Sequence, residues 1–579
     1  SRKITLNNTG TIGLFGKGNS GTLLGTSTDT VNIVNNGIIE LNNANSVGIY
    51  INNNKNGAVV TDAIISNNAT GTTSSFGSTE KNTINVKGDN SIGIYAPFSI
   101  VLQNGNIDLV GTGTVAIYGS NGSNISGGGN IDLNTASQSQ VAYYLKDSGT
   151  KLTNSLGDIT GHGVVVFLED AEIDDTIPTL DLTTSSDLGN GKIVLALKGA
   201  SIFNYTKDIK TGDSVSNHYA VALYTDNQNL SSGIANNLTA GANGVGIYAQ
   251  NGSNIKYSGT INVGNNTVAG TGVYIGTNSG IGSSITLDNA VINLNGAGGI
   301  GAYVDNLSTL TFQANSVMNF SGDGVGIYGV QGAIINDNGG VINSNGYAVE
   351  RTRIQGGIIN INSNINVSGG SILGHAVNGE ISVLPGAIVT ASGDDVIGIF
   401  GDGLKGAGTW TQAYEANNLG TIDFSSSNKA TAIYLNNARG ENKGTVKVND
   451  SSIAFYGQGN GSEIYNNGAV EIGNNSVGLY GNDIDIIENL SGAVIKDKGT
   501  SNTGIYNIKT TPGATAINNN GLIELGNDGV GIYAENSVIT NTGNIIVGDK
   551  VNKNSLGIYA KDSILNDIGN VKVGNSGIA

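Results

Sequence analysis

The 579-residue chain contains no cysteine, and only 4 of its residues are proline. The absence of cysteine excludes disulfides and thiolate chemistry. Cytosolic proteins usually retain some thiols, so this absence also favours an exported protein. Long hydrophobic runs are missing as well: no apolar segment approaches the ~18 residues of a membrane helix. The sequence shows no signal peptide and stops just before an expected aromatic residue, so we expect it to be a fragment of a longer protein.

Charge is also scarce, and it is unbalanced. Charged residues make up 12% of the chain, with 27 Lys and Arg against 44 Asp and Glu, for a net charge of −17. Negative charge repels phosphate backbones, so we expect no nucleic-acid partner. Hydrophobic residues reach 38%, which argues against disorder. The 90 glycines, together with many Val, Ile and Asn, are typical of short strands joined by tight turns.

One four-residue signature recurs along the chain: an aliphatic residue, a small residue, an apolar residue and an aromatic residue. Clear copies occupy residues 47–50, 92–95, 115–118, 221–224, 245–248, 325–328, 477–480, 503–506, 530–533 and 556–559. From Tyr434 to Tyr559 the signature advances 125 residues in five steps, a mean of 25. A fixed period of this length indicates a repeat architecture.

A second element precedes each signature and alternates apolar, polar, apolar, as in Ile107-Asp108-Leu109. Such alternation predicts a strand with one buried face. Asn-Gly or Thr-Gly stands before it, for example at 467–468 and 542–543, and we expect these pairs to form turns with positive φ. A third short strand is expected after the aromatic residue, around 253–255 and 537–539.

Three strands in about 25 residues predict one triangular turn of an all-β, right-handed parallel β-helix (solenoid). We expect about 22 rungs of about 25 residues, forming a single β-helix over 1–579 with a few projecting loops. A β-propeller would need blades of about 40 residues, and these units are too short. We expect the first and third signature positions to face inward and the small and aromatic positions to face outward, with the rings stacked as a ladder. The alternative, rings at an inward corner, stays open.

Function is expected where the repeat fails. Irregular insertions are predicted near 66–82, 169–190, 203–218, 350–376 and 402–420. The segment around 409–415 carries the only Trp of the chain, and aromatic rings bury large areas at little entropy cost. The candidate binding residues are Trp410, Tyr414, Glu415, Phe203, Tyr205, Lys207, Lys210, Arg351 and Arg353. The alternative for Trp410 is that it only packs its loop onto the helix, and the two arginines are expected on one face.

Enzymatic chemistry finds little support in the sequence. Pectin-degrading β-helix enzymes combine Asn-Thr-Asp, Asp-Asp, Gly-His-Gly and a basic triplet in that order, whereas Gly161-His162-Gly163 here precedes its Asp-Asp pairs and the other elements are missing. The histidines, His162, His218 and His375, lie far apart in the sequence, and we expect them not to converge. We therefore predict no enzyme, no catalytic residue, no cofactor and no metal. His375 is expected to occupy a degenerate aromatic slot.

The phrase Asn-Asn-Gly-x-Ile-Glu-Leu followed by Asn-Ser-Val-Gly-Ile-Tyr resembles the passenger domains of large autotransporter adhesins of fusobacteria and their relatives. The resemblance extends over most of the chain, from residue 12 to residue 559. The resemblance implies type V secretion, a location on the extracellular side of the bacterial outer membrane, and a C-terminal membrane barrel outside this sequence. It further implies adhesion to a host-cell receptor or glycan, or to a partner bacterium. No binding residue is implied, because the shared motif is the scaffold.

We therefore expect a surface adhesin segment: a monomeric scaffold that presents binding loops and acts through many weak contacts. The first alternative is a pure structural stalk whose binding head lies elsewhere. The second is a polysaccharide-active enzyme, which a clustered groove of Asp, Lys and Arg would favour.

Overall fold

The structure, a computed structural model, describes residues 3–17, 31–53, 63–68, 83–134, 139–153, 156–177, 179–346, 348–406, 410–510, 513–567 and 569–579. Over these residues the chain forms strands β1 to β64 and one short 3-10 helix, η2 (Leu182–Thr184). The strands pair in parallel with equivalent strands of neighbouring turns, so the all-β parallel solenoid is confirmed. The right-handed winding remains an expectation from the rule for parallel crossovers.

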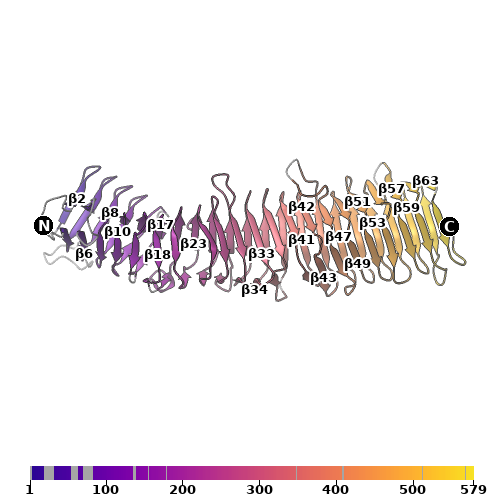
Figure 1. Ribbon diagram of the computed structural model, residues 1–579, viewed down its shortest axis with the longest axis horizontal. Coiled ribbons are helices and arrows are strands. Elements are labelled where there is room, and N and C mark those ends of the chain that lie inside the picture. Colours follow the sequence, from indigo (N-terminus) through magenta and orange to yellow (C-terminus); the bar gives the residue numbers. More distant parts are fainter. Residues whose placement is uncertain are drawn as a thin grey trace. The chain divides into compact units, whose positions relative to one another are not determined.

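The chain divides into two compact units of the same architecture, which we describe separately. Unit 1 comprises residues 1–285, 289–302 and 318–323, and unit 2 comprises 286–288, 303–317 and 324–579. In each unit the strands recur in groups of three, and equivalent strands stack into three columns (Figure 1). We name these the tyrosine column, the alternating column and the third column.

The tyrosine column contains the four-residue signatures. In unit 1 its strands are β2 (Ile12–Lys17), β5 (Val47–Asn52), β8 (Ile92–Pro97), β11 (Val115–Ser120), β14 (Val141–Lys146), β17 (Gly163–Glu169), β20 (Lys192–Lys198), β23 (Val221–Asp226), β26 (Val245–Gln250) and β29 (Thr271–Ile275). In unit 2 they are β35 (Gly324–Gly329), β38 (Val349–Gln355), β41 (Ile372–Val377), β44 (Ile397–Asp402), β47 (Thr431–Asn436), β50 (Ile453–Gln458), β53 (Val477–Asn482), β56 (Thr503–Ile508), β59 (Val530–Glu535) and β62 (Leu556–Lys561). With β32 (Gly299–Val304), whose residues are divided between the units, the described residues form 21 strands of this column, against the expected number of about 22 rungs.

The tyrosine column is continuous within each unit, whereas the other two columns are interrupted. In unit 1 the alternating column runs from β1 (Lys3–Leu6) to β16 (Ile159–Thr160), breaks, and resumes at β19 (Leu180–Asp181). It breaks again in unit 2 between β37 (Val341–Asn343) and β40 (Ile365–Ser368), and from there it continues to β64 (Asn570–Val573). The third column breaks in unit 1 between β21 (Ile202–Asn204) and β24 (Asn229–Ile234).

The signature faces the core at its second and third positions. Ile49 and Ile94, at the third position, are fully buried, as expected. The first position is only partly buried, as at Val47, and the second, Gly48, is buried, so our placement of these two positions was wrong. A Cβ on Gly48 would lie 3.4 Å from the core side chain of Leu41 but only 2.6 Å from the carbonyl oxygen of Gly93 in the next turn. The backbone therefore bends so that two successive residues point inward, and the crowded second position takes a small residue.

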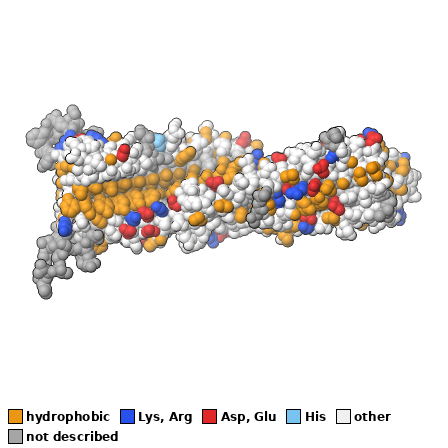
Figure 2. All heavy atoms as spheres, turned by 90° about the horizontal axis from the view of Figure 1, so that it is seen from above, with side chains coloured by type: hydrophobic (Ala, Val, Ile, Leu, Met, Phe, Trp, Pro, Cys, Tyr) orange, Lys and Arg blue, Asp and Glu red, His pale blue; other side chains and the backbone are white. Residues whose placement is uncertain are grey.

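The aromatic residues face outward and stack, which decides between the two interpretations of the sequence. Ring centroids of neighbouring turns lie 4.8 to 5.1 Å apart from Tyr434 to Tyr559 in unit 2, and the rings are nearly parallel. Unit 1 has a ladder from Phe15 to Phe167 with ring centroids 4.8 to 5.3 Å apart, in which the rings are tilted from Phe15 to Tyr118 and stacked from Tyr118 to Phe167. Figure 2 shows hydrophobic side chains, tyrosine included, gathered in a band along part of the surface. Because the rings cover one another, mainly their edges and hydroxyl groups meet solvent.

Buried asparagines form a second ladder inside unit 2. The amide of each donates to the amide oxygen of the next turn at 2.8 to 2.9 Å, and the series is Asn418, Asn442, Asn466, Asn489, Asn519 and Asn541. The Asn-Gly turns that follow differ from expectation, because Gly468 and Gly543 do not have positive φ. A Cβ on Gly543 would instead lie 2.0 Å from the carbonyl oxygen of Gly521. These glycines allow successive turns to approach closely.

Candidate functional sites

In unit 1, lysines of the segment 203–218 bind oxygen atoms of the acidic segment 169–190. Lys207 donates to the carbonyl oxygens of Asp175 and Ile177 at 2.7 and 2.8 Å, and Lys210 Nζ lies 3.0 Å from Asp181 Oδ2. Hydrogen bonding to Asp181 raises the pKa of Lys210. Burial would raise the pKa of Asp181, but hydrogen bonds from Thr183 and Lys210 lower it overall. Both lysines are therefore engaged by the preceding turn.

The predicted aromatic pair of this segment does not project as a loop. Phe203 lies in β21 and is partly buried, whereas Tyr205 is only 2% exposed. Burial raises the pKa of the Tyr205 hydroxyl to about 12. Tyr205 therefore belongs to the core, and its ring is not on the surface available to a partner.

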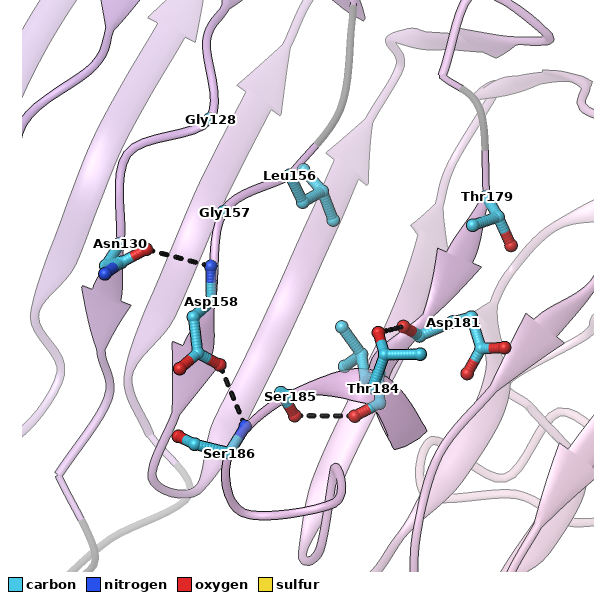
Figure 3. Close-up of a pocket in the computed structure, with 11 residues that line it drawn as sticks. Gly128, Asn130, Leu156, Gly157, Asp158, Thr179, Asp181, Thr184, Ser185 and Ser186 are labelled. Carbon is cyan, nitrogen blue, oxygen red and sulfur yellow. Dashed lines mark hydrogen bonds between the residues drawn. The ribbon is translucent and has the colours of Figure 1, made fainter.

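A polar hollow of about 520 Å³ opens in unit 1 where the alternating column breaks between β16 and β19. It is lined on one side by Gly128, Asn130 and residues 156–158, and on the other, around η2, by Thr179, Asp181, Leu182 and residues 184–186. In Figure 3, Asp158 accepts from the backbone of Ser186 at 3.1 Å, and Asn130 accepts from the backbone of Asp158 at 3.0 Å. Its polar groups thus tie the two sides of the break together.

Two of the three histidines lie together, contrary to the expectation from their sequence distance. The ring centroids of His162 and His218 are 4.3 Å apart in unit 1. A short hairpin, closed by the antiparallel bridge between Val215 and His218, carries the second ring back toward the turn of the first. His218 Nδ1 lies 2.8 Å from the carbonyl oxygen of Ser216. The described residues contain no group of three or more His, Cys, Asp or Glu side chains that could hold a metal ion.

Residues 350–376 lie mostly in strands of the solenoid: β38 and β41 of the tyrosine column, with β39 (Ile358–Ile361) and β40 between them. Arg351 occupies the inward second position and is 8% exposed. Its guanidinium bonds the fully buried Asp337 at 3.0 and 3.1 Å and the carbonyl oxygen of Gly340 at 2.6 Å. Arg353 occupies the aromatic slot and faces outward, directly opposite Tyr328 of the neighbouring strand. The prediction that the two arginines share a face was wrong, because the bend in the strand separates them.

A charged cluster replaces the aromatic ladder at this point of unit 2. His375 follows Arg353 in register and Phe400 follows His375, so the histidine does occupy an aromatic slot. The rings of His375 and Phe400 stack at 4.2 Å. His375 Nδ1 lies 3.2 Å from Glu350 Oε1, and His375 Nε2 lies 3.4 Å from Asp402 Oδ2.

This cluster borders a hollow of about 690 Å³ at the break of the alternating column between β37 and β40. Glu350, Arg353, His375 and Phe400 line one side of the hollow. The remainder of its lining consists of glycines and small or aliphatic residues: Gly324, Val325, Ser344, Gly346, Ala348, Val349, Gly369, Gly370, Ser371 and Ile372. The two hollows, of about 520 and 690 Å³, thus open where a column of strands is interrupted.

The segment near 402–420 departs from the repeat between β44, which ends at Asp402, and β45 (Ala416–Asn418). We call residues 403–415 the anchored loop, of which 407–409 lie outside the described residues. Glu415 is fully buried, accepts from the backbone of Arg439 at 2.7 Å, and pairs with its guanidinium at 2.9 Å. Glu415 therefore holds the loop in place and does not meet solvent.

A buried lysine completes the anchor. Lys405 Nζ lies 3.4 Å from the fully buried carboxylate of Glu380 and donates to the carbonyl oxygens of Gln412 and Tyr414 at 2.6 and 3.0 Å. Glu380 also accepts from the backbone of Thr411 at 3.0 Å. Burial lowers the pKa of Lys405, and the charge of Glu380 opposes that shift.

The two aromatic residues of the anchored loop lie over this network. Trp410 is partly buried, with the Lys405 ammonium 5.2 Å from the ring centroid, and its indole donates to the carbonyl oxygen of Gly406 at 2.8 Å. Tyr414 stacks on Tyr465 at 4.9 Å. Trp410 thus packs on its own loop, and part of its side chain stays exposed. Both roles expected for it, packing of the loop and contact with a partner, fit this position.

Sequence reasoning missed Glu350, Asp402, Glu380 and Lys405. For Glu350 and Asp402 a signal was present, because both lie in signature strands, β38 and β44, whose aromatic slot lacks tyrosine. Glu380 and Lys405 carried no local signal, since their pairing depends on how a loop folds back over the next turn.

Comparison with known proteins gives little guidance to function. No known family and no curated protein matches the sequence. Among solved structures, the chain is similar to a mutant of the PL6-family alginate lyase AlyGC, with 10% identity over 100% of this chain and 97% of that chain, and a TM-score of 0.20. So low a score carries no argument about activity. No helix formed by the described residues is long and apolar enough to cross a membrane.

Proposed function

We propose that the protein is an extracellular binding scaffold, a segment of a bacterial surface adhesin, whose solenoid presents rigid binding elements where the repeat is broken. The observation that carries the proposal is the anchored loop. Its ten described residues are held by two fully buried carboxylates paired with Lys405 and Arg439. Burying such charges costs free energy and adds little net stability. Such an anchor is better explained by a need to hold Trp410 in one position.

The scaffold itself supports the same conclusion. In the regular turns, tyrosine rings stack on one another and buried asparagines bond one another. The interrupted turns are therefore the places where other polar and aromatic groups are available to a partner. The surface location and the host or bacterial partner rest on the sequence resemblance alone. A pure stalk, with binding elsewhere in the parent protein, is the competing outcome.

Binding of the immobilised protein to epithelial cells and to partner bacteria tests the proposal, with a glycan array and a receptor-ectodomain screen to identify the ligand. We expect Trp410→Ala to weaken binding at least about tenfold, because an exposed aromatic anchor contributes a large share of interface energy. Val551→Ala, which trims another exposed apolar side chain of unit 2, should bind as wild type. Full binding by the Trp410 variant would refute the role of the loop, and no binding by wild type would favour the stalk.

A polysaccharide-active enzyme is the second candidate, favoured by the cluster of Glu350, Arg353, His375 and Asp402 beside an open hollow. Carboxylate and imidazole groups in contact can serve as acid and base. Incubation with acidic and neutral polysaccharides, followed by measurement of new reducing ends and of ultraviolet absorbance from unsaturated ends, tests this. Activity that His375→Ala abolishes would establish the enzyme, and a lack of turnover on every polysaccharide would argue against it.

A further inference from the structure

The tyrosine column has an unusual feature beside the hollow at β38 and β41: some polar groups there lack hydrogen-bond partners. In unit 2, the rings contact one another from Phe400 to Tyr559, edge to face between Phe400 and Tyr434 and stacked from Tyr434 onward. At Arg353 the ring is replaced by a guanidinium, and the neighbouring column is broken at the same level. The Arg353 guanidinium therefore lies at the edge of the hollow, where the alternating column breaks between β37 and β40.

Arg353 has donors to spare. Among the described residues, its polar contact is one ion pair, in which Nη1 lies 3.6 Å from Glu350 Oε2, beyond hydrogen-bond distance. Its Nε is buried from solvent without a hydrogen-bond partner. By contrast, the guanidinium of Arg351 makes three hydrogen bonds, to Asp337 and Gly340. A guanidinium with unused N–H groups fits a planar anion such as a carboxylate, which can accept two of its N–H groups at once.

Groups that recognise hydroxyls surround this cation. The carboxylate of Glu350 and the imidazole of His375 line the hollow, as do the side chains of Ser344 and Ser371. Phe400 adds an apolar surface, and the glycines of the lining contribute no side chain that would fill the space. The hollow of about 690 Å³ falls within the roughly 300–1,000 Å³ typical of small-molecule sites.

We propose that this hollow binds a sugar residue that carries a carboxylate, with the carboxylate on Arg353 and ring hydroxyls on Glu350 and His375. The inference rests on the proposed function and deepens it, since it names the ligand class of one broken turn. Glu350 and Asp402 nearby, and the net charge of −17, disfavour a long polyanion. The ligand is therefore a single acidic sugar at the end of a glycan.

Calorimetric titration of the full chain tests the inference with paired probes: a glucuronic-acid-terminated disaccharide against its glucose-terminated counterpart, and 3′-sialyllactose against lactose. We expect at least one acidic member to bind at least tenfold more tightly than its neutral counterpart. Arg353→Gln should remove that preference, with a loss of tenfold or more. Arg353→Lys should retain part of it, because it keeps the charge without the planar fork. Lys498→Gln, the same charge change at an exposed lysine of unit 2, should bind as wild type.

Equal binding of acidic and neutral members, no binding of any probe, or an unchanged preference in Arg353→Gln would each overturn the inference. Circular dichroism of Arg353→Gln and Arg353→Lys separates loss of the site from loss of the fold. Cell binding that depends on Trp410 but occurs without any acidic-sugar binding would overturn this inference alone. Failure of both experiments would overturn the proposed function as well.

Discussion

At the scale of single residues, two arginines of one strand differ in burial because the backbone bends between them. Arg351 and Arg353 are two residues apart, yet one is buried on Asp337 and the other lines the hollow. Alternation along a strand would have placed both on one face. The bend at the second signature position reverses that expectation, and it could not be predicted because glycine and alanine at this position suit either orientation.

The buried pair of Arg351 and Asp337 gives the first prediction. Arg351→Met leaves the Asp337 carboxylate buried without its partner, and we expect the free energy of unfolding to fall by about 3–5 kcal/mol. The double variant with Asp337→Leu removes both charges and should regain most of that loss. Chemical denaturation of the three proteins measures the difference. A single variant as stable as wild type would show that the pair contributes nothing.

Glu169 gives a prediction about pH. A hydrogen bond from Tyr144 lowers its pKa; burial opposes this, and Lys198 and Lys146 lower it further. Because the folded pKa lies below the ordinary 4.5, this group adds stability at pH above 4.5 and loses it as the pH falls through the folded value. Glu169→Gln should therefore cost about 0.5–1 kcal/mol at pH 7 and less at pH 3, which lies below the ordinary pKa of the group.

Thermal unfolding at the two pH values checks this, with Asp395→Asn as a control, since it removes an exposed carboxylate. A cost of Glu169→Gln that stays the same at pH 3 would contradict the assignment, because it would not come from the ionised form.

At the scale of elements, short signatures predicted the strands well, because each three-strand turn repeats the same local chemistry. Expected strands at 107–109, 253–255 and 537–539 appear as β10 (Ile107–Leu109), β27 (Asn254–Tyr257) and β60 (Ser537–Asn541). The irregular segments were predicted less well. Segments 203–218 and 350–376 largely continue the columns with unusual residues, whereas 402–420 is a true insertion. Composition marks both kinds of segment alike, and only the pairing of strands separates them. Most of the insertion expected near 66–82 lies outside the described residues.

The anchored loop gives the prediction at this scale. Lys405→Met leaves Glu380 and the carbonyl oxygens of Gln412 and Tyr414 without their cation, so we expect the loop to detach while the solenoid stays folded. Trp410 is the only tryptophan, so its fluorescence reports on this loop alone. Its emission should shift to longer wavelength and its quenching by acrylamide should rise, with far-ultraviolet circular dichroism unchanged. Lys498→Met, at an exposed lysine, should leave the emission as in wild type, and an unshifted Lys405→Met would mean that the lysine does not anchor the loop.

At the scale of the whole molecule, the architecture follows from one constraint: a single turn cannot bury its apolar face, so each turn depends on its neighbours. Register makes the dependence specific, because Leu479, Ile505 and Ile532 lie opposite one another in successive turns. This is why the fold class could be predicted from the period of the sequence alone. Binding chemistry could not, since it arises from the few turns at which the columns break.

Near-neighbour coupling predicts how damage spreads. Ile505 is fully buried at the third signature position, and Ile505→Ala should cost about 2–5 kcal/mol locally. In a globular core this would destabilise the whole domain, but here the effect should decay along the chain. Hydrogen exchange measured by mass spectrometry should show faster exchange in β53, β56 and β59, a smaller change in the turns beyond them, and none in β8 to β26 of unit 1. Faster exchange spread evenly over both units would show that the solenoid unfolds as one cooperative body, and near-neighbour coupling would then be the wrong description of its stability.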